Sequence, residues 1–458
     1  MSASLSPPVT GWKTLGLLNR YHWFVFVVAA LGWLADCMDQ QLFVLLRQRA
    51  AASLLGLPIS DPTVQVWRDV STSVFLVGWA TGGLFFGVLG DRWGRVKTML
   101  LTILLYSMFT GLSALSVGVW DFTLYRFLTG LGVGGEFAVG VALVAEVMPD
   151  QARPFTLGLL QALSAIGNVA AALLVQWSEP LKSLLGLGEV ESWRMLFVVG
   201  IVPALLALIV RGRLREPERW QKAGATARTA GSYAELLGEQ PWKRRALAGL
   251  VLASAGVIGL WAIGFYAPDL QEQVFSQDLR AQNPEMNEDV LKAEVTKYKG
   301  QTSLMFQIGA FVGIFAFSTV TGFVGRRPTF ALFLLLAMGS TALVFMNFRS
   351  VGDIYWMMPL MGFCQLSLFG GYAIYFPELF PTRLRSTGTS FCYNVGRFVA
   401  ATGPLALIPL RAAFAHTATS TDSTLPFRYG GLAMCSIFAV GLVALLFLPE
   451  TKGKPLPE

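Results

Sequence analysis

The sequence ELFPTRLR at residues 378–385 reads as a glutamate, two residues, a proline, three residues and an arginine. The same frame stands at residues 146–153 as EVMPDQAR. The two copies lie 232 positions apart in a chain of 458 residues, which is about half its length. A frame that returns at half the chain length indicates a duplicated fold, so other landmarks should return at the same spacing.

Two further landmarks do return. DRWGRVK at 91–97 matches GFVGRRP at 322–328 with an offset of 231 between their Gly-Arg pairs. REPERW matches LPETKG, with Glu218 opposite Glu450 at an offset of 232. Three landmarks at nearly one spacing predict two halves of the same topology.

The composition predicts that both halves cross a membrane. Hydrophobic residues make up 54% of the chain, charged residues only 14%, and the mean hydropathy is +0.56. About 20 consecutive apolar residues cross a hydrocarbon core as a helix. We therefore predict an all-α membrane protein of twelve transmembrane helices in two six-helix repeats. The predicted spans are about 23–46, 69–90, 96–117, 120–147, 155–177, 194–211, 246–270, 302–324, 329–347, 353–376, 386–410 and 427–448.

The distribution of positive charge orients these spans. The tails and loops on the side of both termini hold 21 of the 35 Lys and Arg residues, and the opposite loops hold 12. This excess places both termini in the cytoplasm and explains the net charge of +7 without a nucleic-acid partner. The predicted divisions are an N-terminal tail at 1–22, a first half at 23–211, a cytoplasmic linker at 212–244, a second half at 245–449 and a C-terminal tail at 450–458.

Two smaller expectations follow from the same layout. The long segment 271–300 is expected to be a solvated extracellular loop, although its pattern EMNEDVLKAEVTKYKG also allows a short amphipathic helix. The four cysteines fall inside apolar spans, so no disulfide and no metal site is expected.

Several of these motifs resemble a known family. GVLGDRWGRVK at 87–97 resembles the loop motif of the major facilitator superfamily, and RFLTGLG, which begins at Arg126, resembles its fourth-helix motif. The repeated Glu-x-x-Pro-x-x-x-Arg frame is similar to the branch that holds sugar porters, organic-ion transporters and carboxylate symporters. The stretch 132–149, together with Asp36 and Asp39, is most similar to sialate:proton and monocarboxylate:proton symporters. In these relatives a glycine follows the first aspartate, where this chain has Cys37, and the glutamine pair of sugar porters is missing from 259–271.

Charges that do not recur at the repeat spacing are not required by the scaffold, and five of them lie inside predicted spans. They are Asp36, Asp39, Arg126, Glu136 and Arg397. A charged side chain at the centre of a membrane helix costs about 2.5–3.5 kcal/mol, so such residues pair, face water or contact a ligand. Counting 1.5 Å of rise per residue places Asp39 and Arg126 at compatible depths for an ion pair. We predict that this pair couples protons, with Asp36 or Glu136 assisting. The alternative is a static pair that joins the two helices.

Arg397 is predicted to lie near the membrane midplane, 11 residues into its span. Its planar guanidinium suits a carboxylate, so we expect it to bind an anionic substrate. The alternative is a pair with Asp36 or Glu136. The other residues predicted to line the substrate site are Asn394, Tyr393, Gln161, Gln365, Tyr372 and Trp33.

Charges that do recur are interpreted as latches at the cytoplasmic surface. Glu146 with Arg153, and Glu378 with Arg385, are predicted ion pairs. Asp91 and Arg95 are predicted to pair across the interface between the halves, and the family resemblance implies that they favour the outward-open state. Gly322 replaces the aspartate in the second half, so only the first half keeps this latch.

Together these features predict a secondary active transporter that carries a small organic anion, such as a monocarboxylate or a sugar acid, by proton-coupled symport. It would work by alternating access as a monomer in the bacterial cytoplasmic membrane, without a cofactor or metal and without enzyme activity. Its expected partners are the small-molecule substrate, protons and the lipid bilayer. The first alternative is a facilitator or symporter of a neutral or cationic solute such as a sugar. The second is a non-transporting sensor, against which the short tails argue.

Overall fold

The computed structural model describes residues 11–59, 61–187, 190–203, 213–222, 230–401, 413–417 and 424–457. In this part of the chain all regular structure is helical, as predicted. Nine of the described helices are long and apolar enough to cross a membrane. The predicted spans 194–211 and 386–410 lie partly outside the described residues, so the total of twelve stays a prediction.

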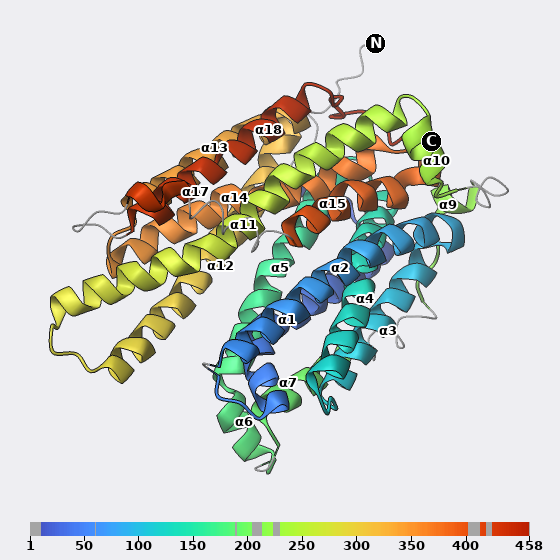
Figure 1. The fold of residues 1–458 in the computed structure, drawn as a ribbon. Helices are drawn as coiled ribbons and strands as arrows, with labels where there is room; N and C mark the ends of the chain where they lie inside the picture. The colour runs from blue at the N-terminus through green and yellow to red at the C-terminus, as the bar shows by residue number, and fades with distance from the viewer. Residues whose placement is uncertain are drawn as a thin grey trace.

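The helices form two groups that lie side by side (Figure 1). The first half contains η1 (Gly11–Leu17), α1 (Arg20–Leu55), α2 (Pro62–Trp93), α3 (Arg95–Ser113), α4 (Val119–Val147), α5 (Arg153–Gln176), α6 (Ser178–Leu184) and α7 (Ser192–Val199). The linker carries α9 (Glu218–Lys222) and α10 (Tyr233–Gly238). The second half contains α11 (Trp242–Gln282), α12 (Glu288–Val324), α13 (Arg326–Asn347), η3 (Val351–Asp353), α14 (Ile354–Leu379), η4 (Thr382–Leu384), α15 (Arg385–Ala401), η5 (Ala415–Thr417), α17 (Leu425–Met434) and α18 (Ser436–Leu445).

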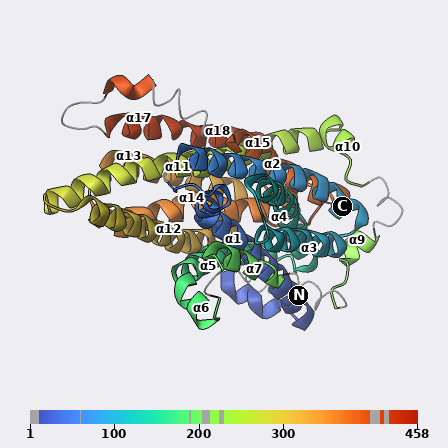
Figure 2. The ribbon, with the colours of Figure 1, turned by 60° about the horizontal axis from the view of Figure 1, so that its bottom comes forward.

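The two halves use equivalent packing. Helix α2 packs on α4 in the first half, and α12 packs on α14 in the second. The halves meet where α2 contacts α15 and where α5 contacts α12, which Figure 2 shows from a second direction. We call the end of the bundle that holds Asp91, Glu146 and Arg385 the terminal end. Both ends of the described chain lie there, because Gly11 approaches Thr319 near the end of α12 and the carbonyl of Pro457 accepts a hydrogen bond from Arg385.

A capping device at the terminal end occurs once in each half. Gly94 and Gly325 precede α3 and α13 with φ of 117° and 114°, a region that favours glycine. Next to Gly94, the Glu216 carboxylate accepts hydrogen bonds from the first backbone N–H groups of α3, including that of Arg95 at 2.7 Å. Next to Gly325, Glu450 does the same for α13, at 3.0 Å from the nitrogen of Arg326. A carboxylate at a helix N-terminus accepts hydrogen bonds from otherwise unpaired N–H donors and interacts favourably with the positive end of the helix dipole.

The capping residue in the first half is therefore Glu216, and the predicted match of Glu218 to Glu450 is wrong by two positions. Arg194 and Arg428 explain the shift. They donate to backbone carbonyls at the ends of α3 and α13, respectively, and they lie 234 positions apart rather than 232. The second half thus has two more residues than the first before its last membrane helix.

Burial works against the charge of Glu450, but backbone N–H groups outweigh it. The donors belong to Arg326, Lys452, Arg327 and Thr451, and together they hold the pKa of Glu450 below its ordinary value. Since this pKa is depressed in the folded state, the contribution of Glu450 to stability is present above the unfolded pKa and is lost as the pH falls through the folded one.

This register gives a direct stability test. Glu216→Ala should lower the free energy of unfolding by about 1 kcal/mol, because it leaves the N-terminus of α3 without its cap. Glu218→Ala should change it little, because Glu218 is exposed and its one ion pair among the described residues is with Lys222 at 3.6 Å. Thermal unfolding of the two purified variants in detergent measures the difference. Equal effects would contradict the register that the structure assigns.

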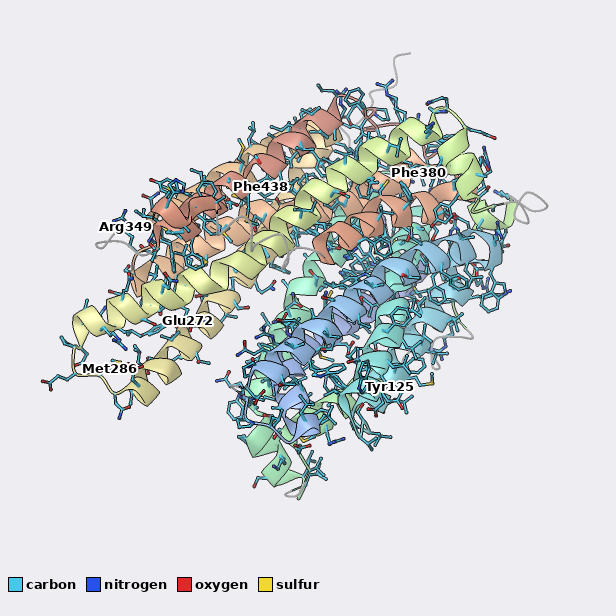
Figure 3. All side chains as sticks on the ribbon, in the orientation of Figure 1. Tyr125, Glu272, Met286, Arg349, Phe380 and Phe438 are labelled. Atoms are coloured by element: carbon cyan, nitrogen blue, oxygen red, sulfur yellow. The ribbon has the colours of Figure 1, made fainter. Side chains whose placement is uncertain are left out.

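The prediction of a solvated loop at 271–300 is wrong. Helix α11 continues to Gln282 and α12 begins at Glu288, so the segment forms a helical hairpin with a turn at 283–287. Its apolar residues pack together, with the Phe275 and Tyr298 rings 5.9 Å apart, and Lys299 pairs with Glu272 at 2.6 Å. Glu272 and Met286 mark this hairpin at the end of the molecule far from Phe380 (Figure 3). The amphipathic pattern allows the helices to extend because it provides one apolar face for each helix to bury.

Candidate functional site at the interface between the halves

An ion pair joins α1 to α4 inside the first half. Oδ1 of Asp39 lies 3.8 Å from Nη1 of Arg126, and both side chains are buried. Nε and Nη2 of Arg126 donate to Oγ of Ser113 at 3.1 and 2.7 Å, whereas no described residue lies within hydrogen-bond distance and angle of either carboxylate oxygen of Asp39. Arg126 also lies over the Phe197 ring, 4.8 Å from its centroid. The arginine is thus held independently of the aspartate, so Asp39 is the partner with fewer restraints.

Two further buried carboxylates lie on the same two helices. Asp36 and Glu136 are each 1% exposed, and Oδ1 of Asp36 and Oε2 of Glu136 have no hydrogen-bond partner in the described part of the chain. Glu136 lies against Gly32, one turn before Asp36 on α1. Among the described residues, Arg126 is the one cation that forms an ion pair with any of these three carboxylates. The first half therefore concentrates acidic groups away from water.

Arg397 brings a buried cation to the interface from α15. Its Nη1 donates to the backbone carbonyl of Tyr393 at 3.0 Å and to Oδ1 of Asn394 at 2.9 Å, while its Nε has no partner within the described ranges. It forms no ion pair with a carboxylate of the described residues, so the alternative of a pair with Asp36 or Glu136 is not observed. The guanidinium instead lies 4.1 Å from the ring centroid of Trp79 and 4.2 Å from that of Tyr393.

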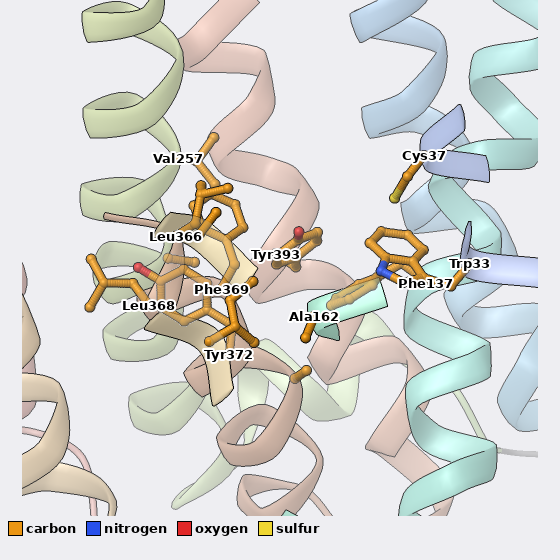
Figure 4. Packing of buried hydrophobic residues seen from close by; sticks show 14 of the residues in the cluster. Trp33, Cys37, Phe137, Ala162, Val257, Leu366, Leu368, Phe369, Tyr372 and Tyr393 are labelled. Carbon is orange, nitrogen blue, oxygen red and sulfur yellow. The ribbon is translucent and has the colours of Figure 1, made fainter. Parts of the chain in front are cut away.

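An aromatic cluster surrounds this position, with contributions from both halves. The Tyr393 ring stacks on Phe137 of α4 with centroids 4.0 Å apart, and Phe137 contacts Trp33 of α1 at 4.8 Å (Figure 4). Asn394 also donates to Oγ of Ser390 at 3.0 Å. Gln161 on α5 is buried, and its Oε1 has no partner. Four of the residues predicted to bind substrate, Trp33, Tyr393, Asn394 and Arg397, are thus linked in one interface region.

Tyr372 and Gln365 have other commitments. The Tyr372 hydroxyl donates to the carbonyl of Leu252 at 2.9 Å, and Nε2 of Gln365 donates to Oγ1 of Thr341 at 2.6 Å. Both bonds join helices within the second half. Sequence reasoning instead missed Trp79, whose only signal is a large ring among the small residues of α2.

At the terminal end, Asp91 reaches from α2 into the second half. Its carboxylate accepts hydrogen bonds from the backbone nitrogens of Ser386 and Thr387 at 3.0 and 2.8 Å, and from the Thr387 hydroxyl at 2.6 Å. It also pairs with Arg95 at 2.5 Å. Asp91 therefore caps the N-terminus of α15 from the opposite half.

Glu146 joins the same network but not with its predicted partner. Its carboxylate pairs with Arg95 at 3.0 Å and with Arg385 of the second half at 2.6 Å. Arg153 instead pairs with Asp150 and donates to the carbonyl of Ala145 at 2.8 Å. The predicted pair of Glu146 with Arg153 is therefore wrong, because the arginine, seven residues further along the chain, instead contacts its own turn at Ala145 and Asp150.

The predicted pair of Glu378 with Arg385 is wrong for a related reason. Arg385 crosses to the first half, so Glu378 pairs with Arg326 at 2.7 Å and accepts a hydrogen bond from the Thr451 hydroxyl at 2.5 Å. Both partners of Glu378 belong to the second half. The repeated glutamates thus differ in role, since Glu146 bridges the halves and Glu378 does not.

Known transport proteins are similar to this chain in sequence and in fold. A cis,cis-muconate transport protein of Acinetobacter baylyi is 29% identical over 96% of this chain and 97% of its own length. A protein of Cupriavidus pinatubonensis, named as a probable 4-methylmuconolactone transporter, is 28% identical over 92% of this chain and 89% of its own length. The solved proton:xylose symporter XylE, bound to 6-bromo-6-deoxy-D-glucose, has the same fold with a TM-score of 0.70 at 17% identity over 95% of this chain and 98% of its own.

The family model of the Major Facilitator Superfamily matches residues 23–404. These residues include the buried charges on α1, α4 and α15, together with Asp91, Arg95, Glu146 and Arg385 at the terminal end. The chain is a multi-pass integral membrane protein and belongs to the Major Facilitator Superfamily of transporters.

Proposed function

We propose that this protein is a secondary active transporter that carries a small organic anion together with protons by alternating access. The observation that carries the proposal is Arg397, a buried guanidinium between the halves that has a free Nε donor and no carboxylate partner among the described residues. A buried charge without a counter-ion is costly unless a ligand supplies one, and a carboxylate fits the guanidinium fork. The muconate transport relative supports this substrate class, since muconate is itself a carboxylate.

The three carboxylates of the first half are proposed to carry the proton. A carboxylate in a dry site is stabilised in its charged form by a nearby cation and takes up a proton when that cation moves away. Asp39 has one such cation, at 3.8 Å, and no competing hydrogen bond. Asp36 and Glu136 lie close enough on α1 and α4 to assist. In this mechanism the Asp91 and Glu146 network holds the terminal end closed while the opposite end admits substrate.

The test uses purified protein in liposomes that enclose a pH-sensitive dye. An inward gradient of cis,cis-muconate should acidify the lumen, while glucose and betaine should not. Protein-free liposomes are the control, because weak acids also cross bare bilayers, and their dye signal must not change. Uptake of labelled muconate without acidification would instead support a facilitator, and uptake of glucose or betaine alone would favour the neutral or cationic alternative. Binding without uptake of any of these solutes would indicate a sensor.

Asp39→Asn should abolish lumen acidification by muconate, since an amide cannot exchange the proton. Binding of muconate should stay within about threefold of wild type, because a neutral isostere leaves Arg126 in contact with Ser113 and the surrounding rings. Dye fluorescence and isothermal titration calorimetry measure the two quantities on the same preparation. Acidification at the wild-type rate would exclude Asp39 as the coupling residue.

A further inference from the structure

Trp79 provides a contact to Arg397 from the opposite half. The tryptophan lies on α2 and the arginine on α15, and the guanidinium carbon is 4.1 Å from the indole centroid. Both residues are buried, at 3% and 2% exposure. Cation–π attraction strengthens when the cation is removed from water, as it is here.

The position of the indole is set by the packing of the first half. A Cβ at Gly134 of α4 would lie 1.9 Å from the carbonyl oxygen of Trp79, so the backbones of α4 and α2 are in close contact at this residue. Phe75, one turn earlier on α2, packs edge-on against the indole at 5.7 Å. No described residue accepts a hydrogen bond from the indole Nε1, so no polar bond from these residues holds the ring. The indole therefore contacts the guanidinium of Arg397 through its ring face.

That contact leaves the arginine free to bind at its edge. The rings of Trp79 and Tyr393 both lie within cation–π distance, and Nη1 is fixed by Tyr393 and Asn394. Nε has no hydrogen-bond partner among the described residues, and it lies in the plane of the guanidinium. A carboxylate binds a guanidinium in that plane, so stacking on the ring faces and binding of an anion at the edge are compatible.

We infer that Trp79 is a positioning residue for the anion site, acting through Arg397. The inference rests on the proposed anion transport. The indole orients the guanidinium so that its Nε edge is ready for a carboxylate. Because the indole and the cation belong to different halves, the contact exists only while α2 and α15 are packed together, so the same ring also stabilises closure of the terminal end.

Binding is the first arm of the test. Trp79→Leu should weaken cis,cis-muconate binding about tenfold, since it removes a desolvated cation–π contact. Trp79→Phe should restore binding to within about threefold, because a face remains for the guanidinium. Trp193→Leu is the matched control, since Trp193 is also 3% exposed and lies 4.3 Å from the guanidinium carbon of Arg194, away from the interface. Equal losses in the Trp79→Leu and Trp193→Leu proteins would overturn the inference, because they would show only a general packing defect.

Conformation is the second arm and needs no ligand. Spin labels on cysteines introduced at the exposed positions Lys97 and Val324 report the separation of the halves at the terminal end. Trp79→Leu should move the distance distribution toward longer separations, while Trp79→Phe and Trp193→Leu should not. An unchanged distribution in Trp79→Leu would overturn the inference. If wild-type protein binds no muconate, the proposed substrate class fails for that probe, and the distance measurement alone then decides the role of Trp79.

Discussion

Replacing Arg397 with alanine is expected to abolish measurable uptake of cis,cis-muconate while the protein stays folded. Truncating one side of a buried charge pair costs about 2–5 kcal/mol, which corresponds to at least about thirtyfold in Kd. Arg397→Lys keeps the charge but loses the planar fork and the free Nε donor. Its affinity for muconate should therefore lie between those of the wild type and Arg397→Ala. Isothermal titration calorimetry measures the Kd of each variant, and labelled uptake measures transport.

Arg194→Ala is the control for this experiment. Arg194 holds the end of α3 through the carbonyls of Ala114 and Ser116, so its loss should lower stability without lowering affinity. Wild-type affinity in a folded Arg397→Ala protein would place the anion site elsewhere. A neutral solute whose uptake survives the substitution would point to the facilitator alternative.

Replacing Glu146 with glutamine should open the terminal end. The carboxylate is fully buried between Arg95 of its own half and Arg385 of the other, so neutralising it leaves two buried cations without their shared partner. Breaking a buried ion pair from one side costs about 3–5 kcal/mol. That free energy is large enough to shift a closed end to a mainly open one. Transport should fall with it, because a carrier that cannot close at this end cannot present its site to the opposite side.

Glu378→Gln is the matched control, because Glu378 occupies the repeated position but pairs with Arg326 inside the second half. Both variants should lower the thermal unfolding midpoint. Only Glu146→Gln should lengthen the distance between spin labels at Lys97 and Val324. An equal change in both variants, or none in either, would contradict the role of Glu146 as the bridge between the halves.

The features that could be predicted from the sequence depend on position along single helices. Depth counted from a span's start brought Asp39 and Arg126 to matching levels, and the structure has them 3.8 Å apart. The repeated Gly-Arg pairs likewise predicted equivalent landmarks in the two halves, and the structure has α3 beginning at Arg95 and α13 at Arg326. Helical rise is regular, so such counting needs no knowledge of tertiary packing.

The features that could not be predicted depend on how the halves meet. Glu146 and Arg385 lie 239 positions apart and pair because α4 and α15 approach at one end of the bundle. The residue spacing within either copy of the motif does not predict this contact, because its two residues belong to different copies. Trp79 was not predicted for the same reason. A tryptophan on an apolar helix usually packs against other apolar residues, and its contact with Arg397 follows only from the position of α15. The hairpin at 271–300 was misjudged because polar residues on one helix face were interpreted as a solvated loop.

The hairpin of α11 and α12 also provides a site at which a soluble protein can be fused. Helices α11 and α12 extend well past the turn expected from hydropathy, and they are tied together by apolar packing and by the pair of Lys299 with Glu272. The turn NPEMN at 283–287 is polar and mostly exposed, the kind of site that tolerates an inserted domain. A rigid soluble fusion at this turn would move as one body with the second half. It would give particle images an asymmetric marker by which a small membrane protein can be aligned in electron cryo-microscopy.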